Sequence, residues 1–323
     1  MTDSVLVTGG AGFIGSHLSE RLLACGERVT VFDNFDPYYP EAIKRANLEA
    51  VLAAGATLVQ GDVRDPAALR SAMAEHSVDR VVHLAARPGV RPSLEAPQIY
   101  LDINVSGTLH VLEACREFAV GKVVFASSSS VYGATTEPAG EEATPCRPLS
   151  PYGASKVAGE ALCSSFATSA GLSIAALRFF TVYGPRQRPD MAINRFTRLI
   201  AAGEQVPVYG DGSSQRDYTY VSDTVAGIVA ALDDATPGYS VFNLGRGEPV
   251  VLRDLLGYLE REIGESARLE HLPEQPGDPQ STCADIGRAR RALGYEPKVT
   301  AAEGVRLYAH WYREMNRDRI ASR

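Results

Sequence analysis

The chain has 323 residues, of which 45% are hydrophobic and 22% charged, so it is long enough for one large domain or two coupled domains with a substantial core. A formal net charge of -7 argues against a broad surface for nucleic acid or for an anionic membrane. The cysteines are scattered without C-x-x-C spacing, and no apolar run approaches the ~20 residues that span a bilayer, so we expect a cytoplasmic protein with reduced thiols and no metal site.

The first predicted element is a strand over 4–8, where S-V-L-V-T is a short apolar, β-branched run that leaves no room before it for a signal peptide. Gly9, Gly12 and Gly15 follow, and helical periodicity begins at 16–24. Glycines let the backbone turn tightly and approach phosphate groups, and a helix N-terminus presents N–H groups to their charge. Strand, glycine turn and helix in this order predict a dinucleotide-binding site, with a merely flexible turn as the alternative.

The second predicted strand, 29–32, ends at Asp33, which lies 18 residues beyond Gly15. A carboxylate there can accept hydrogen bonds from the adenosine ribose and would repel a 2′-phosphate, so NAD is favoured over NADP. A turn aspartate that local amides satisfy is the alternative. The third predicted strand, 57–60, leads to Asp62, which is placed to meet the adenine edge.

Strands and helices continue to alternate along the first half of the chain. Further strands are predicted at 80–84, 122–126 and 174–178, and helices at 41–54, 66–75, 98–118 and 151–170. This alternation indicates an α/β fold, a Rossmann doubly wound and mostly parallel sheet that binds ligands at the carboxyl ends of its strands. Ala85-Ala86 and the serine run 127–130 follow two of these strands, although a serine run is often only a polar loop.

Tyr152 and Lys156 are four residues apart in the predicted helix 151–170, so their side chains share one face. A phenol normally loses its proton at about pH 10, and a lysine ammonium beside it favours the phenolate, as a nicotinamide ring would. Most tyrosine–lysine pairs at this spacing are solvated helix faces. In a chain that also predicts a dinucleotide site, the pair indicates a general base.

Beyond residue 181 the regular alternation weakens, and proline and glycine become frequent. We therefore predict an NAD-binding Rossmann domain over 1–181 and a smaller mixed α/β substrate-binding domain over 182–323. A strand near 239–245 is expected to return to the main sheet. Helices are predicted in the second domain at 191–202, 222–233, 252–263 and 301–316.

Together these motifs resemble those of the extended short-chain dehydrogenases/reductases, over residues 4 to 312. The family's order and spacing are matched by T-G-G-A-G-F-I-G, Asp33, S-S-S-S-V-Y-G, Y-G-A-S-K and R-F-F-T-V-Y-G-P. The resemblance implies that Tyr152 is the catalytic base, that Lys156 binds the nicotinamide ribose and lowers the tyrosine pKa, and that Ser128 hydrogen-bonds the reacting oxygen. The residues expected to contact NAD are Gly9, Gly12, Phe13, Ile14, Gly15, Asp33, Asn34, Lys44, Asp62, Val63, Leu84, Ala85, Ala86, Ser127, Tyr152 and Lys156.

The serine loop favours epimerisation among the reactions of this family. Sugar-nucleotide 4,6-dehydratases carry T-D-E in this loop, and UDP-glucuronate decarboxylases carry a glutamate before V-Y-G. Here Ser129 and Ser130 stand at these positions, and a hydroxyl can hydrogen-bond but supplies no carboxylic acid or carboxylate. This difference indicates oxidation followed by re-reduction, and therefore an epimerase.

Three stretches are similar to the UDP-glucuronate 4-epimerases in particular, namely 34–40 with Lys44 after it, 186–192 and 275–278. Each taken singly is otherwise an irregular surface loop. The similarity implies an NAD-dependent enzyme that interconverts UDP-glucuronate and UDP-galacturonate. The alternatives are a 4-epimerase of UDP-glucose or UDP-N-acetylglucosamine, and a non-enzymatic NAD-sensing regulator on the same fold.

The UDP group of the substrate is expected to be held in the second domain. Arg216 is the candidate diphosphate partner, because a guanidinium fork suits phosphate oxygens, and a surface salt bridge with a nearby aspartate is the alternative. The candidate substrate contacts are Arg87, Ser128, Ser129, Tyr152, Thr181, Arg188, Val208, Tyr209, Arg216 and Asp278. Helices 98–118 and 151–170 are expected to pair with a symmetry mate in a homodimer.

Overall fold

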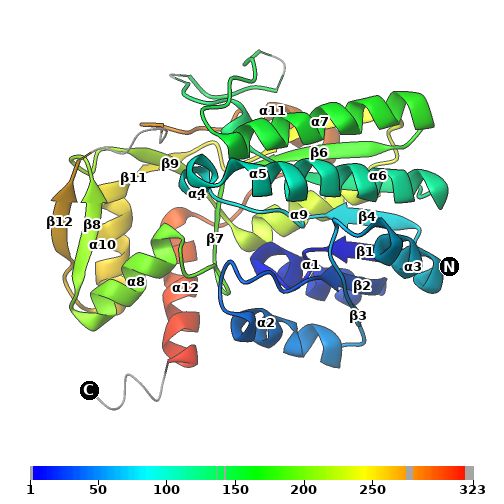
Figure 1. Ribbon diagram of the computed structural model, residues 1–323. Coiled ribbons are helices and arrows are strands. Elements are labelled where there is room, and N and C mark those ends of the chain that lie inside the picture. The colour runs from blue at the N-terminus through cyan, green and yellow to red at the C-terminus, as the bar shows by residue number, and fades with distance from the viewer. Residues whose placement is uncertain (1–2, 136, 142, 274–278, 317–323) are drawn as a thin grey trace.

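A seven-stranded sheet forms the larger part of the computed structural model, which describes residues 3–316 except 136, 142 and 274–278 (Figure 1). Its order is β10-β6-β5-β4-β1-β2-β3, and every pairing is parallel. The strands are β1 (Ser4–Thr8), β2 (Arg28–Asp33), β3 (Thr57–Gln60), β4 (Arg80–His83), β5 (Lys122–Ser128), β6 (Ile174–Phe179) and β10 (Tyr239–Leu244). The order reverses beside β1, which creates a crevice at the carboxyl ends of β1 and β4. The predicted α/β fold class is confirmed.

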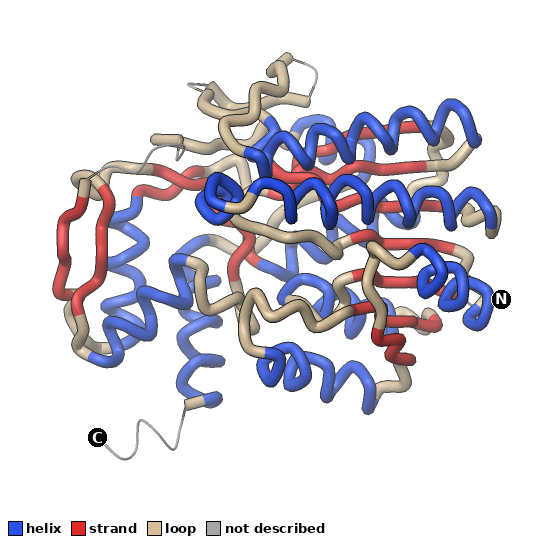
Figure 2. Tube along the Cα trace, viewed as in Figure 1, coloured by secondary structure: helices blue, strands red, loops and turns tan. Residues whose placement is uncertain are grey.

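Helices cover both faces of this sheet (Figure 2). One face carries α1 (Phe13–Ala24), α2 (Glu41–Ala53) and α9 (Val221–Asp233); the other carries α3 (Pro66–His76), α6 (Gly107–Glu117) and α7 (Pro151–Ala170). Alternate side chains of a strand point to opposite faces, so Val5 and Val7 join one buried cluster while Leu6 joins the other. Because both faces are buried, β1 is apolar throughout its interior rather than alternating.

Local capping fixes the start of α7, the helix that carries Tyr152. The Ser150 hydroxyl accepts a hydrogen bond from the Gly153 N–H at 3.1 Å, and Pro151 occupies the first helical position. A Cβ on Gly153 would lie 2.6 Å from the Ser130 carbonyl oxygen, so the glycine lets the helix approach the serine loop closely. The helix ends at Gly171, whose φ of +68° is left-handed.

The segment predicted as one helix over 98–118 is interrupted. The structure has α4 (Val90–Glu95), α5 (Pro97–Tyr100), a π-helical turn η1 (Leu101–Ser106) and then α6. Within the π-helical turn, the Asn104 side chain accepts from the Arg87 N–H at 2.7 Å and donates to the Ser155 hydroxyl at 2.9 Å. These long-range contacts offset the less favourable helical geometry, and no local periodicity reveals them.

The smaller part lies beyond one end of the large sheet, at the left of Figure 1. It has a three-stranded sheet in the order β11-β9-β7 and a two-stranded sheet of β8 and β12. Its elements are β7 (Thr181–Tyr183), α8 (Ala192–Ala202), β8 (Gln205–Tyr209), β9 (Gln215–Tyr220), β11 (Pro249–Val251), α10 (Leu252–Ile263), β12 (Arg268–Leu272) and α12 (Ala301–Met315). α9, β10 and α11 (Gly287–Leu293), although they come after residue 181, pack with the large sheet. Among the described helices, none has the length and apolar character needed to cross a bilayer.

Candidate active site

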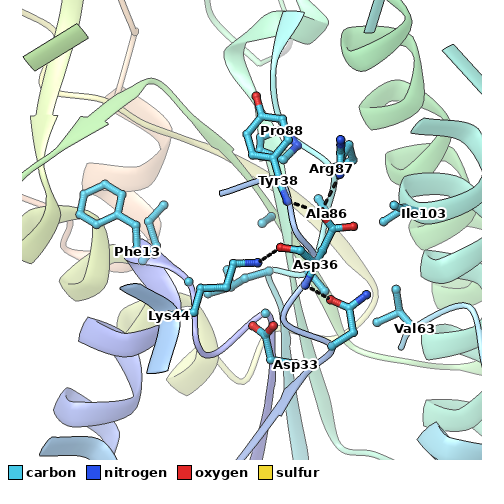
Figure 3. A pocket seen from close by; sticks show the side chains of 18 of the residues that line it. Phe13, Asp33, Asp36, Tyr38, Lys44, Val63, Ala86, Arg87, Pro88 and Ile103 are labelled. Atoms are coloured by element: carbon cyan, nitrogen blue, oxygen red, sulfur yellow. Dashed lines mark hydrogen bonds and ion pairs between the residues drawn. The ribbon is translucent and has the colours of Figure 1, made fainter. Parts of the chain in front are cut away.

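A pocket lies at the carboxyl ends of the central strands of the large sheet (Figure 3). Its empty volume is about 1150 Å³ including the open mouth, which suits a dinucleotide better than a small ion. All the residues expected to contact the cofactor line it. Within the described chain, no group of histidine, cysteine and acidic side chains is arranged to hold a metal ion.

The glycine turn between β1 and α1 forms one wall of this pocket. Gly9 has a φ of +72°, and a Cβ there would lie 2.7 Å from the Ala85 backbone nitrogen. A Cβ on Gly15 would collide with the Gly9 carbonyl oxygen. In the described chain no side chain caps the first turn of α1, which begins directly after Gly12. The turn therefore has the shape and the N–H groups that a diphosphate requires.

Asp33 ends β2 at the rim of the pocket and is 7% exposed. Its carboxylate accepts from the Ala11 N–H at 3.1 Å and from the Phe35 N–H at 2.8 Å, so local amides do contact it, as the alternative interpretation held. Burial raises the pKa of Asp33, while the Phe35 N–H and the Lys44 charge oppose that rise. Each carboxylate oxygen has a second acceptor site, so these contacts leave room for a ribose hydroxyl.

Asp62 lies beside the same end of the pocket. It forms two hydrogen bonds with the Arg64 guanidinium, at 3.0 and 2.7 Å, and accepts a third from the Asn34 amide at 2.8 Å. The Arg64 hydrogen bonds hold the pKa of Asp62 at about 2 against the effect of burial. Asp62 is therefore a fixed acceptor at neutral pH.

The loop after β2 contributes Asp36, Tyr38 and Tyr39 to the lining of the pocket, whereas the sequence predicts only Asn34 of this loop as a site residue. In Figure 3, Lys44 and Arg87 converge on Asp36: Lys44 Nζ donates to its carbonyl at 2.6 Å, and Arg87 pairs with its carboxylate at 2.6 Å. The Arg87 guanidinium also lies 4.6 Å from the centre of the Tyr38 ring. Other lining residues that sequence reasoning missed are Phe32, Tyr39, Gly61, Pro88, Ile103, Ala126 and Phe179. The similarity of 34–40 to the epimerases could have indicated that this loop belongs to the site. No feature of the local sequence indicates that the other residues line the pocket.

Tyr152 lies in the first turn of α7 and lines the pocket. Burial raises the pKa of its phenol, and a hydrogen bond with the Ser128 hydroxyl and the charge of Arg188 both lower it. The Tyr100 ring packs edge-on against the phenol ring, with centroids 6.3 Å apart. The geometry thus brings together the predicted base and the predicted serine partner.

Lys156, one turn after Tyr152 on α7, contacts the neighbouring strand β5. Its ammonium donates to the Ala126 carbonyl at 2.7 Å and lies 5.1 Å from the centre of the Phe125 ring. The charge of Arg188 lowers the pKa of the Tyr152 phenol, and the effect of Lys156 on this phenol remains a prediction. The Lys156 ammonium points toward the strand because β5 offers a backbone acceptor beside it.

The predicted substrate contacts fall into three groups. Arg87, Tyr152 and Arg188 line the pocket, and the Arg188 guanidinium donates to both oxygens of Asp190 at 3.0 Å. Ser128 is the last residue of β5, and Ser129 begins the short 3-10 turn η2 (Ser129–Val131). Both directly follow Ser127, which lines the pocket. Thr181, Val208, Tyr209 and Arg216 lie outside the described lining of this pocket, in the strands of the smaller sheets. Asp278, together with 275–277, lies outside the described residues.

Tyr209 and Arg216, two of the predicted substrate contacts in the smaller sheets, each contact another part of the chain. Arg91 of α4 places its guanidinium 4.6 Å from the centre of the Tyr209 ring, which joins the two parts of the structure. Arg216 Nη1 donates to the Gln280 carbonyl at 3.4 Å. Asp217, the aspartate next to Arg216 in the sequence, accepts hydrogen bonds from the backbone N–H groups of Arg246 and Gly247.

Known proteins resemble this chain over nearly its whole length. Residues 5–245 match the NAD dependent epimerase/dehydratase family. A UDP-glucuronate 4-epimerase of Thermodesulfobacterium geofontis is 40% identical over 311 residues, which cover 96% of each chain. The crystal structure of UDP-glucuronic acid 4-epimerase from Bacillus cereus, in complex with UDP-glucuronic acid and NAD, superposes with a TM-score of 0.92 at 36% identity, covering 97% of this chain and 99% of that one. A UDP-glucose 4-epimerase from Thermus thermophilus, solved with NAD, has a TM-score of 0.88 at 36% identity, covering 96% and 99%.

Proposed function

The chain belongs to the NAD dependent epimerase/dehydratase family, and we propose that it is a UDP-glucuronate 4-epimerase that interconverts UDP-glucuronate and UDP-galacturonate. The observation that carries the proposal is the likeness, over nearly the full length, to an enzyme solved with both UDP-glucuronic acid and NAD. The catalytic side chains agree with it, because Tyr152 lines the pocket and Ser128 lies close enough to its phenol to lower the pKa.

The residues of the pocket fit NAD. The glycine turn 9–15 would hold the diphosphate, Asp33 and Asp62 the adenosine end, and Tyr152 with Lys156 the nicotinamide end. When bound, NAD supplies the acceptor and then the donor of a hydride at C4 of the sugar, which passes through a 4-ketone. Lys44 and Arg87 both bind Asp36 and so hold the loop 34–40 in place beside the pocket. This arrangement supports retention of the cofactor through both half-reactions.

Tyr152 acts as the general base on the C4 hydroxyl and later returns the proton from its phenol. Ser128 donates to or accepts from the same oxygen while it remains within reach of the phenol. The Arg188 charge favours the phenolate form that the first step needs. Ser129 and Ser130 contribute hydroxyls but no carboxyl group, so the site lacks at these positions the acid and base that elimination of water would require.

A uronic acid makes the 4-ketone a β-keto acid, which loses CO2 when the bond to its carboxylate aligns with the ketone π system. An epimerase must therefore restrain the carboxylate. We assign this role to Thr181, Ser128 and Ser129; Thr181 begins β7 and is partly exposed, as is Ser129. Arg216 remains the proposed partner of the diphosphate, and Val208 and Tyr209 those of the uridine.

Replacing Thr181 or Ser129 with alanine is expected to increase loss of CO2. A hydrogen bond to a charged group contributes about 1.5–3 kcal/mol, so roughly tenfold more UDP-pentose per turnover should form. Chromatography of the nucleotide products measures this ratio. Ser169→Ala is the matched control, because that hydroxyl bonds only its own exposed helix turn in the described structure. A ratio equal to that of the unchanged protein in both variants would remove Thr181 and Ser129 from this role.

The test of the function is incubation with UDP-glucuronate and no added cofactor, followed by proton NMR of the products. Appearance of UDP-galacturonate supports both the reaction and a retained NAD. Conversion of UDP-glucose or UDP-N-acetylglucosamine, with none of UDP-glucuronate, would assign the chain to the other 4-epimerases, which the Thermus thermophilus likeness keeps as the second candidate. No conversion of any sugar, with NAD bound, would indicate the non-enzymatic regulator.

We also propose a homodimer. α6 and α7 pack side by side on the same face of the large sheet, and Leu101 and Leu149 near them are 43% and 50% exposed. Pairing of these two helices with their symmetry mates would form a closed, isologous contact. Light scattering of the purified protein measures the mass, and a value near 34.6 kDa, the mass of one chain, would contradict the dimer.

A further inference from the structure

Glu160 and Arg178 form a buried ion pair outside the described lining of the pocket. Glu160 lies on α7, one helical turn after Lys156, and Arg178 lies on β6. Arg178 donates to both carboxylate oxygens, from Nη2 at 2.7 Å and from Nε at 2.9 Å. The two side chains are only 6% and 9% exposed. A buried pair of this kind carries a large desolvation cost, so its retention calls for a role.

The pair contacts the site through Ser127. The Ser127 hydroxyl donates to Glu160 Oε1 at 2.5 Å, and Ser127 and Arg178 are register partners in the sheet. Ser127 lines the pocket, and the next residue, Ser128, is the hydrogen-bond partner of Tyr152. Glu160 thus links the end of β5 to the helix that carries the catalytic tyrosine and lysine.

Arg178 extends the same network away from the pocket. Its guanidinium lies 4.7 Å from the centre of the Tyr132 ring and 3.3 Å from the Cys146 sulfur. The Tyr132 hydroxyl donates to Asn243 on β10 at 2.7 Å. Four neighbouring elements, α7, β5, β6 and β10, are therefore connected through one buried carboxylate and its arginine.

Lys156 faces several titratable groups. Burial lowers its pKa to about 8, while Cys163 and Glu160, both on α7, raise it. Burial raises the pKa of the Cys163 thiol, so this thiol is uncharged at neutral pH. His83 on β4 is also neutral, since burial and the Lys156 charge lower its pKa to about 3. Among these described groups Glu160 is the one that forms an ion pair as the acidic partner, and its partner is Arg178.

We propose that Glu160 is a positioning residue of the active site, which holds Ser127 in place through its carboxylate and keeps the Lys156 ammonium charged at the pH where the enzyme works. The proposal rests on the function proposed above, because it assigns a role to the same site. Glu160 acts through Ser127 and Lys156 rather than by touching substrate.

The direct test is an NMR titration of the lysine side chains. The chain's lysines are Lys44, Lys122, Lys156 and Lys298, so 13C-labelled lysine gives a spectrum that lysine-to-arginine variants can assign. In Glu160→Gln, which keeps the size and an acceptor oxygen, we expect the pKa of Lys156 to fall by about one unit. The ammonium is then lost at lower pH, so the alkaline limb of kcat should move down and kcat at pH 8 should fall roughly fivefold with KM little changed.

Two variants serve as controls, both titrated in the full-length chain and in the same cofactor state. Glu117→Gln removes an acid from an exposed pair with Arg70 and should change nothing. Glu160→Asp keeps the charge and should restore most of the alkaline limb.

An unchanged Lys156 titration in Glu160→Gln would overturn the proposal, as would an alkaline limb of kcat that stays at the same pH. If Glu160→Gln fails to fold, the double variant Glu160→Gln/Arg178→Met removes both charges, and an unchanged Lys156 titration there has the same meaning. The titration needs no substrate. Absence of epimerisation by the unchanged protein would therefore count against the proposed function alone, while the lysine titration still tests Glu160.

Discussion

Replacing Tyr152 with phenylalanine should reduce kcat for epimerisation by roughly 10³-fold or more, while NAD binding is retained. The substitution removes the phenol oxygen that takes the C4 proton and leaves the ring in contact with Tyr100. Because burial already raises the pKa of this phenol, the structure has to lower it again through Ser128 and Arg188. A group so placed is expected to act as a base rather than as a packing element.

Steady-state kinetics with UDP-glucuronate, together with calorimetry of NAD binding, measure both parts of this prediction. Tyr258→Phe, in α10 of the smaller part, is the matched control and should leave kcat unchanged. A Tyr152→Phe protein that keeps more than about a tenth of the kcat, well above what loss of a general base leaves, would exclude this tyrosine as the base.

Replacing Gly15 with alanine should abolish NAD binding and destabilise the fold. A Cβ at this position would collide with the Gly9 carbonyl oxygen and would lie 2.7 Å from the Gly10 Cα. Both are backbone atoms of the turn itself, so they cannot move aside as a flexible side chain would. Either the turn opens, which removes the diphosphate site, or α1 shifts away from β1.

Calorimetry of NAD binding and thermal unfolding measure the two effects. Gly257→Ala is the matched control, since a Cβ there meets nothing within 4 Å and the residue lies inside α10. This variant should bind NAD normally and gain about 1 kcal/mol of stability, because alanine is the better helix former. Normal NAD binding by Gly15→Ala would show that the glycine turn does not cradle the cofactor.

Much of the fold follows from local pattern. The apolar run of β1, the glycine turn and the helix after it predicted the first unit of the sheet, and the structure has them at Ser4–Thr8 and Phe13–Ala24. The predicted helix 151–170 is confirmed at the same residues, because Ser150, Pro151 and Gly171 are local start and stop signals. The family assignment was equally accessible, since its motifs are contiguous in sequence. The domain boundary at 181 and the roles of the site residues remain predictions.

The parts that sequence reasoning missed depend on contacts between distant segments. The π-helical turn at Leu101–Ser106 exists because Asn104 bonds to Arg87 and Ser155, and the pattern expected one unbroken helix there. Likewise, the Lys156 ammonium donates a hydrogen bond to the Ala126 carbonyl on β5, a partner that the local sequence does not reveal. Periodicity reports which face of an element is apolar, and it carries no information about which polar group lies opposite.

Sequence alone therefore determined the α/β fold class, the glycine turn, the tyrosine–lysine helix and the family, because each is encoded within a few consecutive residues or a single period. Only the tertiary structure decided that loop 34–40 lines the pocket and is held by Arg87, that Arg188 lies close enough to act on Tyr152, and that Glu160 meets both Arg178 and Ser127. Glu160 and Arg178 show why the sequence alone does not reveal such contacts. They come from a helix and a strand, and they touch only because parallel pairing places β6 beside β5 under α7.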